Sequence, residues 1–133
     1  MNQRDQLIKE IRGESLGNVS NQSSSDELFQ NEVLRPILKF QNDLFIASFL
    51  NYISKYKRDF YTKTVENKLA IIENAIQKDI KFRNALKGMI IALFTTDEYS
   101  LYIQNSSSLN KRMMNLLIER LKSQVQLFEN LEH

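Results

Sequence analysis

The sequence predicts an all-α protein, a compact bundle of four to six helices with a flexible N-terminal arm. Apolar residues recur every three or four positions along most of the chain, which is the spacing of one face of an α-helix. Only three Gly and one Pro occur in 133 residues, whereas a β-rich chain needs many turns that draw on both. The sequence also lacks sustained apolar–polar alternation and the Asn-Gly or Asp-Gly turns typical of hairpins.

The N-terminal part is predicted to be a short helix followed by an arm. Apolar residues occupy one side of residues 4–12, but a helix of this length is rarely stable alone in water. Residues 13–25 are rich in Gly, Ser and Asn, which favours a flexible segment. We therefore expect residues 1–24 to form a helix and an arm, and residues 25–130 to form one helical domain.

The last three residues, Leu131-Glu132-His133, are predicted to be the remnant of a cloning scar and a polyhistidine tag. On this interpretation the natural chain has no His, Cys or Trp. The absence of Cys excludes disulfides and fits a reducing compartment. The opening residues lack the apolar stretch of a signal peptide, and the longest apolar run, residues 89–94, is far short of a membrane span. We expect a cytoplasmic protein without membrane contact.

A long helix is predicted to begin at Ser25, whose hydroxyl suits an N-cap. Pro36 interrupts the apolar pattern of this helix. Because proline lacks an amide hydrogen and clashes with the preceding turn, we expect a kink or a break near residues 32–36. The charged residues 55–59 are expected to end the helix.

The remaining helices are predicted from apolar stripes and polar caps. Thr62 or Thr64 is expected to cap the next helix, and Asp79 either lies within that helix or caps a new one. Thr96 is expected to cap a short helix. Residues 105–108 are expected to form a loop that leads into the last helix.

A broad apolar face distinguishes one segment from an ordinary surface helix. The six consecutive apolar residues 89–94 cover every side of a helix, and the last helix has a similarly wide apolar face. Such a segment either lies in the core alone or is shared with a second chain, since wide apolar faces often mark association. The candidate interface residues are Met89, Ile90, Ile91, Phe94, Met113 and Met114.

The positive charge is concentrated in the middle of the chain. Residues 35–91 contain eleven basic and five acidic side chains, although the net charge of the whole chain is only +2. A phosphate or nucleic-acid ligand requires Lys and Arg clustered on one face, but so small a net charge does not favour a nucleic-acid partner. A charge-balanced helix exterior is the simpler interpretation. The candidate basic patch is Lys78, Lys81, Arg83 and Lys87, with Lys55, Lys57 and Arg58 upstream.

A polar cluster precedes the last helix. Tyr99, Tyr102 and Asn105 lie before a helix N-terminus, where backbone N–H groups can hold an anion, and Arg112 follows nearby. These four residues are a candidate site for a small polar ligand. A capped connection between two helices is the simpler interpretation, because Ser and Asn are common N-caps.

The sequence indicates no catalytic or metal-binding residues and no cofactor. Without native His or Cys, the usual zinc site, the Glu-x-x-His di-iron site and the His-based triad are excluded. A magnesium site of carboxylates alone would use Glu66 with Glu73, or Asp97 with Glu98. Solvated helix faces and charges in a first helical turn explain these residues more simply.

The stretch from Ile76 to Leu121 resembles a family of small all-helical bacterial proteins without an established mechanism, whose members often carry a glyoxalase label. Residues 4–18 extend the resemblance more weakly. The resemblance implies a glyoxalase as one possible activity. Metal-dependent glyoxalases, however, bind a divalent metal through His and Glu, commonly on a βαβββ scaffold. This chain offers neither native His nor predicted strands.

The sequence therefore favours a binding protein over an enzyme. The favoured hypothesis is a protein that acts through contact with an unknown partner protein or as a homo-oligomer. The alternatives are a weak binder of nucleic acid or a phosphate ligand through residues 55–87 and, less favoured, the glyoxalase.

Overall fold

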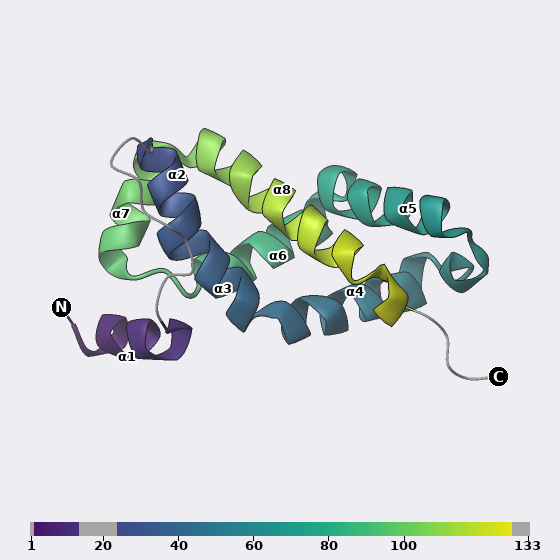
Figure 1. Ribbon diagram of the computed structural model, residues 1–133, viewed down its shortest axis with the longest axis horizontal. Helices are drawn as coiled ribbons and strands as arrows, with labels where there is room; N and C mark the ends of the chain where they lie inside the picture. The colour runs from purple at the N-terminus through teal and green to yellow at the C-terminus, as the bar shows by residue number, and fades with distance from the viewer. Residues whose placement is uncertain (1, 14–23, 129–133) are drawn as a thin grey trace.

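The computed structural model describes residues 2–13 and 24–128, in which all regular structure is helical (Figure 1). The predicted all-α class is confirmed for these residues. The helices are α1 (Gln3–Arg12), α2 (Ser25–Phe29), α3 (Arg35–Phe40), α4 (Asn42–Tyr56), α5 (Val65–Lys78), α6 (Ile80–Ile91), α7 (Thr96–Gln104) and α8 (Ser106–Ser123). A π-helical turn, η1 (Gln30–Leu34), joins α2 to α3, and 3₁₀ turns η2 (Phe60–Thr62) and η3 (Val125–Leu127) follow α4 and α8.

The number of helices exceeds the prediction. Because α2, η1 and α3 are continuous, the described residues form seven separate helices rather than four to six. The additional break lies at Gln41, whose φ of −88° and ψ of 4° separate α3 from α4. The apolar stripe continues across this residue, so its spacing could not reveal the break. The predicted arm falls mostly on residues 14–23 and the predicted tag remnant on residues 131–133, and both segments lie outside the described residues.

Pro36 neither breaks the helix nor ends it. It occupies the first turn of α3, directly after the π-helical turn. In that turn the N–H of Arg35 donates to the carbonyl of Gln30, five residues back. The wider turn changes the spacing of the carbonyls that precede the proline ring, and the chain continues as a helix.

Two of the predicted N-caps are displaced by one residue. Ser24, rather than Ser25, accepts a hydrogen bond from the N–H of Glu27 and caps α2. Thr95, rather than Thr96, caps α7, where Glu98 completes a reciprocal capping box. Adjacent hydroxyl residues offer the same chemistry, and the local backbone conformation decides which of them serves as the cap.

Aromatic rings around Phe49 form one end of the core. Phe49 lies on α4 and is fully buried, and four other rings have centroids 4.8–6.4 Å from its own. This aromatic cluster consists of Phe49, Tyr52, Phe60, Phe82 and Phe128. Because its rings come from α4, η2, α6 and the chain beyond α8, the cluster ties together segments that are distant in sequence.

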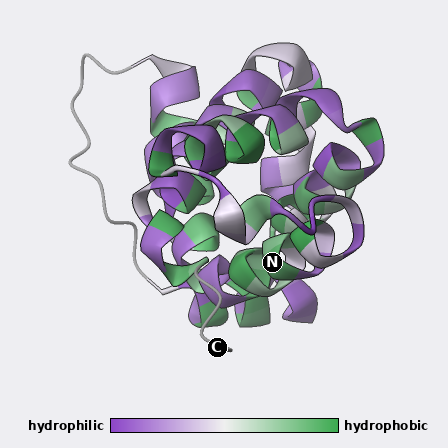
Figure 2. Ribbon diagram, turned by 90° about the vertical axis from the view of Figure 1, so that its right-hand side faces the viewer, coloured by the Kyte–Doolittle hydropathy of each residue, from purple (hydrophilic) through white to green (hydrophobic). Residues whose placement is uncertain are grey.

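The broad apolar face predicted at residues 89–94 and on the last helix belongs mainly to the core. Ile90, Phe94, Met113 and Met114 are buried within this chain. Met89 and Ile91 are partly buried and pack against the same core. Within α6 itself Leu86 and Ile90 are buried, and the apolar run continues past the end of this helix into the turn before α7 (Figure 1). Figure 2 shows that hydrophobic and hydrophilic residues alternate along the helices. Four of the six candidate interface residues are therefore inaccessible to a second chain in this conformation.

Charged side chains attach α1 to the turn between α6 and α7. Arg4 donates hydrogen bonds to the carbonyls of Phe94 and Ala92, each at 2.9 Å. The carboxylate of Asp5 accepts hydrogen bonds from the N–H of Thr96 at 3.1 Å and from its hydroxyl at 2.5 Å. Cations therefore meet the carbonyls that end α6, and an anion meets the N-terminus of α7, as the helix dipoles favour.

Arg12 completes this attachment at the other end of α1. Its two terminal nitrogens contact the two carboxylate oxygens of Glu98, and one of them also donates to the carbonyl of Leu93. The side chain of Arg12 is only 5% exposed, and its Nε has no hydrogen-bond partner among the described residues. We call Arg4, Asp5 and Arg12, with the groups they contact in residues 92–98, the α1 joint.

Candidate ligand-binding site

The polar cluster predicted before the last helix makes its hydrogen bonds within the chain. Asn105 and Ser108 donate to the two carboxylate oxygens of Asp26, at 2.7 and 2.6 Å. Arg112 donates to the side chain of Gln30 at 3.0 Å. The anion that this helix N-terminus was predicted to attract is therefore supplied by Asp26, from α2.

The two predicted tyrosines of this cluster have different environments. Tyr102 is buried, and its hydroxyl donates to the side chain of Asn110 at 2.6 Å. Tyr99 is about half exposed, and its ring centroid lies 6.1 Å from that of Tyr102. The simpler interpretation, a capped connection, is wrong in its cap, because Asn105 makes no side-chain capping hydrogen bond to α8. Residues 106–108, predicted as a loop, form the first turn of α8.

The pKa of Asp26 reflects its role in this connection. The hydrogen bond from Ser108 is the largest cause that lowers the pKa below its ordinary value, and partial desolvation opposes it. The hydrogen bond from Asn105 and the positive charge of Arg112 lower the pKa further. Asp26 is therefore ionised at neutral pH and acts as a fixed internal anion.

The predicted basic patch is divided by the fold. Lys78 and Lys81 line one surface hollow, at the junction of α5 and α6. Arg83 and Lys87 are not among the residues that line it. At about 100° per residue, they lie roughly 200° and 240° around α6 from Lys81. Lys57, which follows α4, lines the same hollow as Lys78 and Lys81. Lys55, in the last turn of α4, lines a second hollow together with Lys81.

Two adjoining hollows lie between the end of α4 and the α5–α6 junction. The first has a volume of about 580 Å³ and the second about 410 Å³. They share Tyr52, Asp79 and Lys81, and together we call them the lysine hollow. The first is also lined by Lys57, Ile71, Asn74, Ala75, Lys78 and Ile80, and the second by Ser48, Asn51, Lys55, Tyr56 and Phe82.

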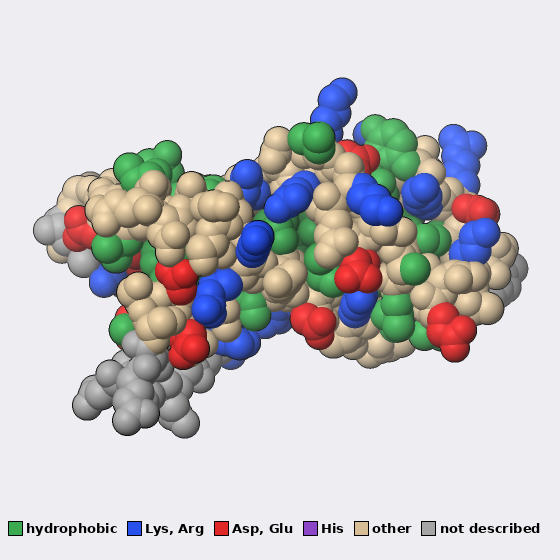
Figure 3. Space-filling model, turned by 90° about the horizontal axis from the view of Figure 1, so that it is seen from above, with side chains coloured by type: hydrophobic (Ala, Val, Ile, Leu, Met, Phe, Trp, Pro, Cys, Tyr) green, Lys and Arg blue, Asp and Glu red, His purple; other side chains and the backbone are tan. Residues whose placement is uncertain are grey.

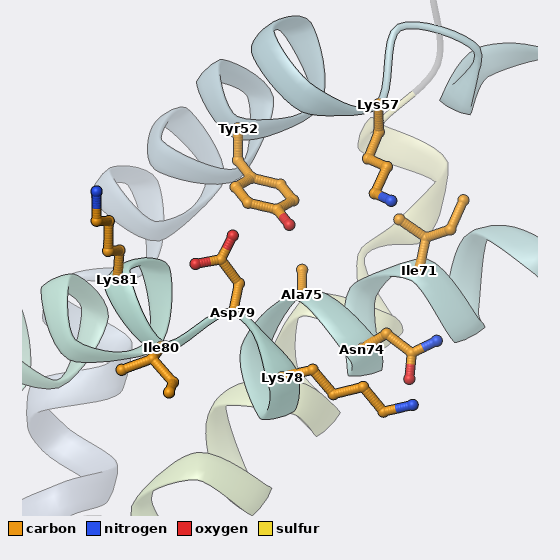
Figure 4. A pocket seen from close by; sticks show the side chains of 9 residues that line it. All are labelled: Tyr52, Lys57, Ile71, Asn74, Ala75, Lys78, Asp79, Ile80 and Lys81. Atoms are coloured by element: carbon orange, nitrogen blue, oxygen red, sulfur yellow. The ribbon is translucent and has the colours of Figure 1, made fainter.

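Asp79 creates this geometry by separating α5 from α6. Its backbone is extended, with φ −85° and ψ 101°, and its carboxylate accepts a hydrogen bond from the N–H of Phe82 at 3.1 Å. Asp79 therefore caps α6, which was one of its two predicted roles. Figure 4 shows Lys78 and Lys81 leaving the junction on either side of Asp79, while Lys57 reaches in from α4.

The lysine hollow is electropositive. It contains four lysines and one carboxylate, that of Asp79. None of the four lysines takes part in an ion pair with any residue in 2–13 or 24–128. Figure 3 shows both Lys or Arg and Asp or Glu side chains on the face seen from above. The hollow therefore has an excess of positive charge that its own lining does not neutralise.

Tyr52 and Asp79 face each other at the centre of the hollow (Figure 4). Burial raises the pKa of the Tyr52 phenol, and the negative charge of Asp79 raises it further. The phenol therefore remains protonated at neutral pH and can donate a hydrogen bond.

Sequence reasoning missed the tyrosines of the hollow. Tyr52 and Tyr56 were not among the candidate site residues predicted from the sequence, yet they line the second hollow with Lys55. Their four-residue spacing, with a lysine between them, was the available signal. No sequence pattern indicated that Asn51 and Asn74 would line the hollow.

A third hollow, of about 810 Å³, is lined by Arg35, Leu38, Leu116, Glu119, Arg120, Ser123 and Gln124. Its polar groups are largely engaged within the chain. Arg35 donates to Asn31, Arg120 contacts Asn42, and Gln124 bonds to Asn42 as well. Despite its larger volume, it has fewer free donors than the lysine hollow.

The carboxylates considered for magnesium are separated or engaged. Glu73 pairs with Lys122, and Glu98 pairs with Arg12 and caps α7. Within the described ranges, no three His, Cys, Asp or Glu side chains gather in a way that could hold a metal ion. Every described helix is also too short or too polar to span a lipid bilayer.

Comparison of the chain with models of known protein families, with curated proteins and with solved structures found no match in any of the three.

Proposed function

We propose that this protein binds a phosphate-bearing ligand in the lysine hollow, and that its role is binding rather than catalysis. The observation that carries the proposal is the gathering of Lys55, Lys57, Lys78 and Lys81 around one site. These lysines come from α4 and from both sides of the α5–α6 junction. Like charges repel one another, so holding them together favours a bound anion that neutralises them.

The other groups of the hollow suit the same ligand. The amides of Asn51 and Asn74 can donate hydrogen bonds to phosphate oxygens. Asp79 is the one opposing charge, and the N–H of Phe82 already occupies part of its carboxylate.

Calorimetric titration with inorganic triphosphate at low salt tests the proposal. We expect a triple variant, Lys57→Gln, Lys78→Gln and Lys81→Gln, to lose on the order of tenfold or more in affinity, because three charge contacts are removed. Affinity for the unchanged protein should also fall as salt rises. The matched control neutralises Lys9, Lys39 and Lys111, three exposed lysines outside the hollow.

The control variant has the same net charge as the test variant. An equal loss in both would mean that triphosphate responds to overall charge, and absence of binding to the unchanged protein at low salt would eliminate the site. Asp79→Asn sharpens the result. Asparagine caps helices as well as aspartate does, so the α6 N-terminus should persist while removal of the opposing charge tightens binding severalfold.

Self-association is the second candidate function, with a second copy of this chain as the partner. Exposed apolar side chains on α7 favour it, since Tyr99 and Ile103 lie one helical turn apart and are 48% and 56% exposed. Light scattering on tag-free protein should detect a dimer that Ile103→Glu dissociates. A monomer at high concentration would contradict this candidate.

The proposal also covers the location of the protein in the cell and its lack of glyoxalase activity. We infer a bacterial, cytoplasmic protein from the family resemblance and from the absence of Cys. We also expect no turnover of lactoylglutathione by tag-free protein, because the ligands of a glyoxalase metal are missing from the natural chain. Measurable turnover would reverse the preference for binding over catalysis.

A further inference from the structure

We propose that the ligand of the lysine hollow is a nucleotide unit, whose base stacks on Tyr56 while its phosphates lie among the lysines. This inference rests on the proposed phosphate site and adds a second recognition element to it. The element is an aromatic surface that the core does not use.

A short row of aromatic rings leads from the core to the hollow. The rings of Phe82 and Tyr52 are stacked, with centroids 4.3 Å apart and planes 20° apart. The ring of Tyr56 follows, 5.2 Å from Tyr52. Phe82 packs against the core and Tyr52 is 7% exposed, but Tyr56 is 66% exposed. The row therefore ends in an accessible ring that is supported from behind by Tyr52.

The position of Tyr56 relates this ring to the positive charge. Tyr56, Lys55 and Lys81 line the second hollow. Tyr52 and Asp79 form the border between that hollow and the first, where Lys57 and Lys78 lie. A planar group on Tyr56 and a phosphate among the lysines are therefore the adjoining parts of one ligand.

Polar groups suited to the edge of a base lie beside the ring. Asn51 is exposed and lines the same hollow as Tyr56, and its amide both donates and accepts hydrogen bonds. The carboxylate of Asp79 accepts hydrogen bonds and suits an exocyclic amine of a base. This gives Asp79 a favourable role in a site that otherwise attracts anions.

The balance of charges favours a nucleotide over an uncharged aromatic ligand. Four lysines outweigh the single carboxylate at the hollow, and stacking alone would not use them. Proteins that bind single-stranded nucleic acids combine the same two elements, a basic groove and aromatic stacking surfaces. The shared chemistry is a base joined to phosphate, either as a free nucleotide or within a single strand.

Calorimetric titrations in magnesium-free buffer compare adenosine triphosphate with inorganic triphosphate. Inorganic triphosphate carries the greater charge, so any preference for the nucleotide comes from its nucleoside. We expect adenosine triphosphate to bind on the order of tenfold more tightly, which is the range that base–aromatic stacking supplies. Tyr56→Ala should remove that preference and leave triphosphate binding unchanged, whereas Tyr56→Phe should retain it. The matched control is Tyr99→Ala, at a half-exposed tyrosine of α7.

The outcomes separate this inference from the proposed function. Equal binding of the two probes to the unchanged protein overturns the base site and leaves the phosphate site intact. Binding of neither probe overturns both. A preference that survives Tyr56→Ala also overturns the inference. A ten-nucleotide single-stranded DNA serves as a third probe, and tighter, Tyr56-dependent binding of it supports a strand as the source of the nucleotide unit.

Discussion

The α1 joint and the aromatic cluster hold the two ends of this molecule by different physical means. At the joint, α1 is attached through Arg4, Asp5 and Arg12, while only Ile8 among its apolar residues is buried. At the cluster, the fully buried ring of Phe49 packs against rings from several segments. Figure 1 shows α1 as a separate short helix beside α3 and α7.

This difference predicts how each end of the molecule responds to mutation, pH and salt. Burial of aromatic rings depends on apolar area and packing, which are insensitive to pH and only weakly sensitive to salt. A joint of carboxylates and guanidinium groups depends on geometry and ionisation. We therefore expect mutations to cost most at the cluster, and pH to act mainly at the joint and at Asp26.

The largest effect is expected for Phe49→Ala. Removal of a fully buried ring at the centre of the aromatic cluster should lower the free energy of unfolding by about 3–5 kcal/mol. Chemical denaturation measures this loss. Phe40→Ala, at a half-exposed ring on α3, is the control and should cost about 1 kcal/mol or less. Equal losses would mean that the cluster is not the centre of the core.

A smaller effect is expected for Arg12→Ala. This change removes the ion pair and the hydrogen bonds that Arg12 makes to the largely buried carboxylate of Glu98. The free energy of unfolding should therefore fall by about 2–4 kcal/mol. Amide hydrogen exchange should show faster opening of α1, while amides near the aromatic cluster stay protected. Lys9→Ala, at an exposed position of the same helix, is the control. Faster exchange throughout the chain would contradict a local joint.

The smallest effect is expected from acid. The hydroxyl hydrogen bond of Thr96 is the largest cause that lowers the pKa of Asp5, desolvation opposes it, and the Thr96 N–H and Arg4 lower the pKa further. A carboxyl group whose pKa is lowered in the folded state stabilises the fold above its unfolded pKa, and this contribution is lost as pH falls through the folded value. The same sign applies to Asp26. Stability should therefore decline as pH falls below about 4.

Denaturation at a series of pH values measures this decline. The double variant Asp5→Asn and Asp26→Asn should be less stable than the unchanged protein at neutral pH and should lose less stability in acid. An unchanged slope below about pH 4 would show that other carboxylates control the acid response.

Most of the fold followed from local rules that the sequence displays. The stripe from residue 65 to residue 76 became α5, with Thr64 as its cap. The short helix after residue 95 became α7. The break at Gln41 was not predicted, because the apolar pattern continues across it. Near residues 32–36, where a kink or a break was predicted, the structure has a π-helical turn instead. The spacing of apolar residues predicts which face of a helix is buried, but it does not predict a local change in the geometry of the helical turns.

Only part of the candidate site could be predicted from the sequence. Lys78 and Lys81 were grouped with Arg83 and Lys87 because all four are close in sequence. Asp79 starts a new helix between them, which turns Lys81 toward the end of α4 and leaves Arg83 on the far side of α6. The partners of Lys78 and Lys81 are therefore residues more than twenty positions earlier, which no local spacing relates to them.

The sequence by itself determined that the described residues are helical, which residues are apolar enough to be buried, and that Cys and Trp are absent. These properties depend on composition and on spacing within a few turns. The tertiary structure alone decided that Asp26 accepts a hydrogen bond from Ser108, that Phe94 lies in the core, and that Lys57 lines the same hollow as Lys78 and Lys81. These outcomes depend on which helices pack together, because charge and burial act through space between residues that are distant along the chain.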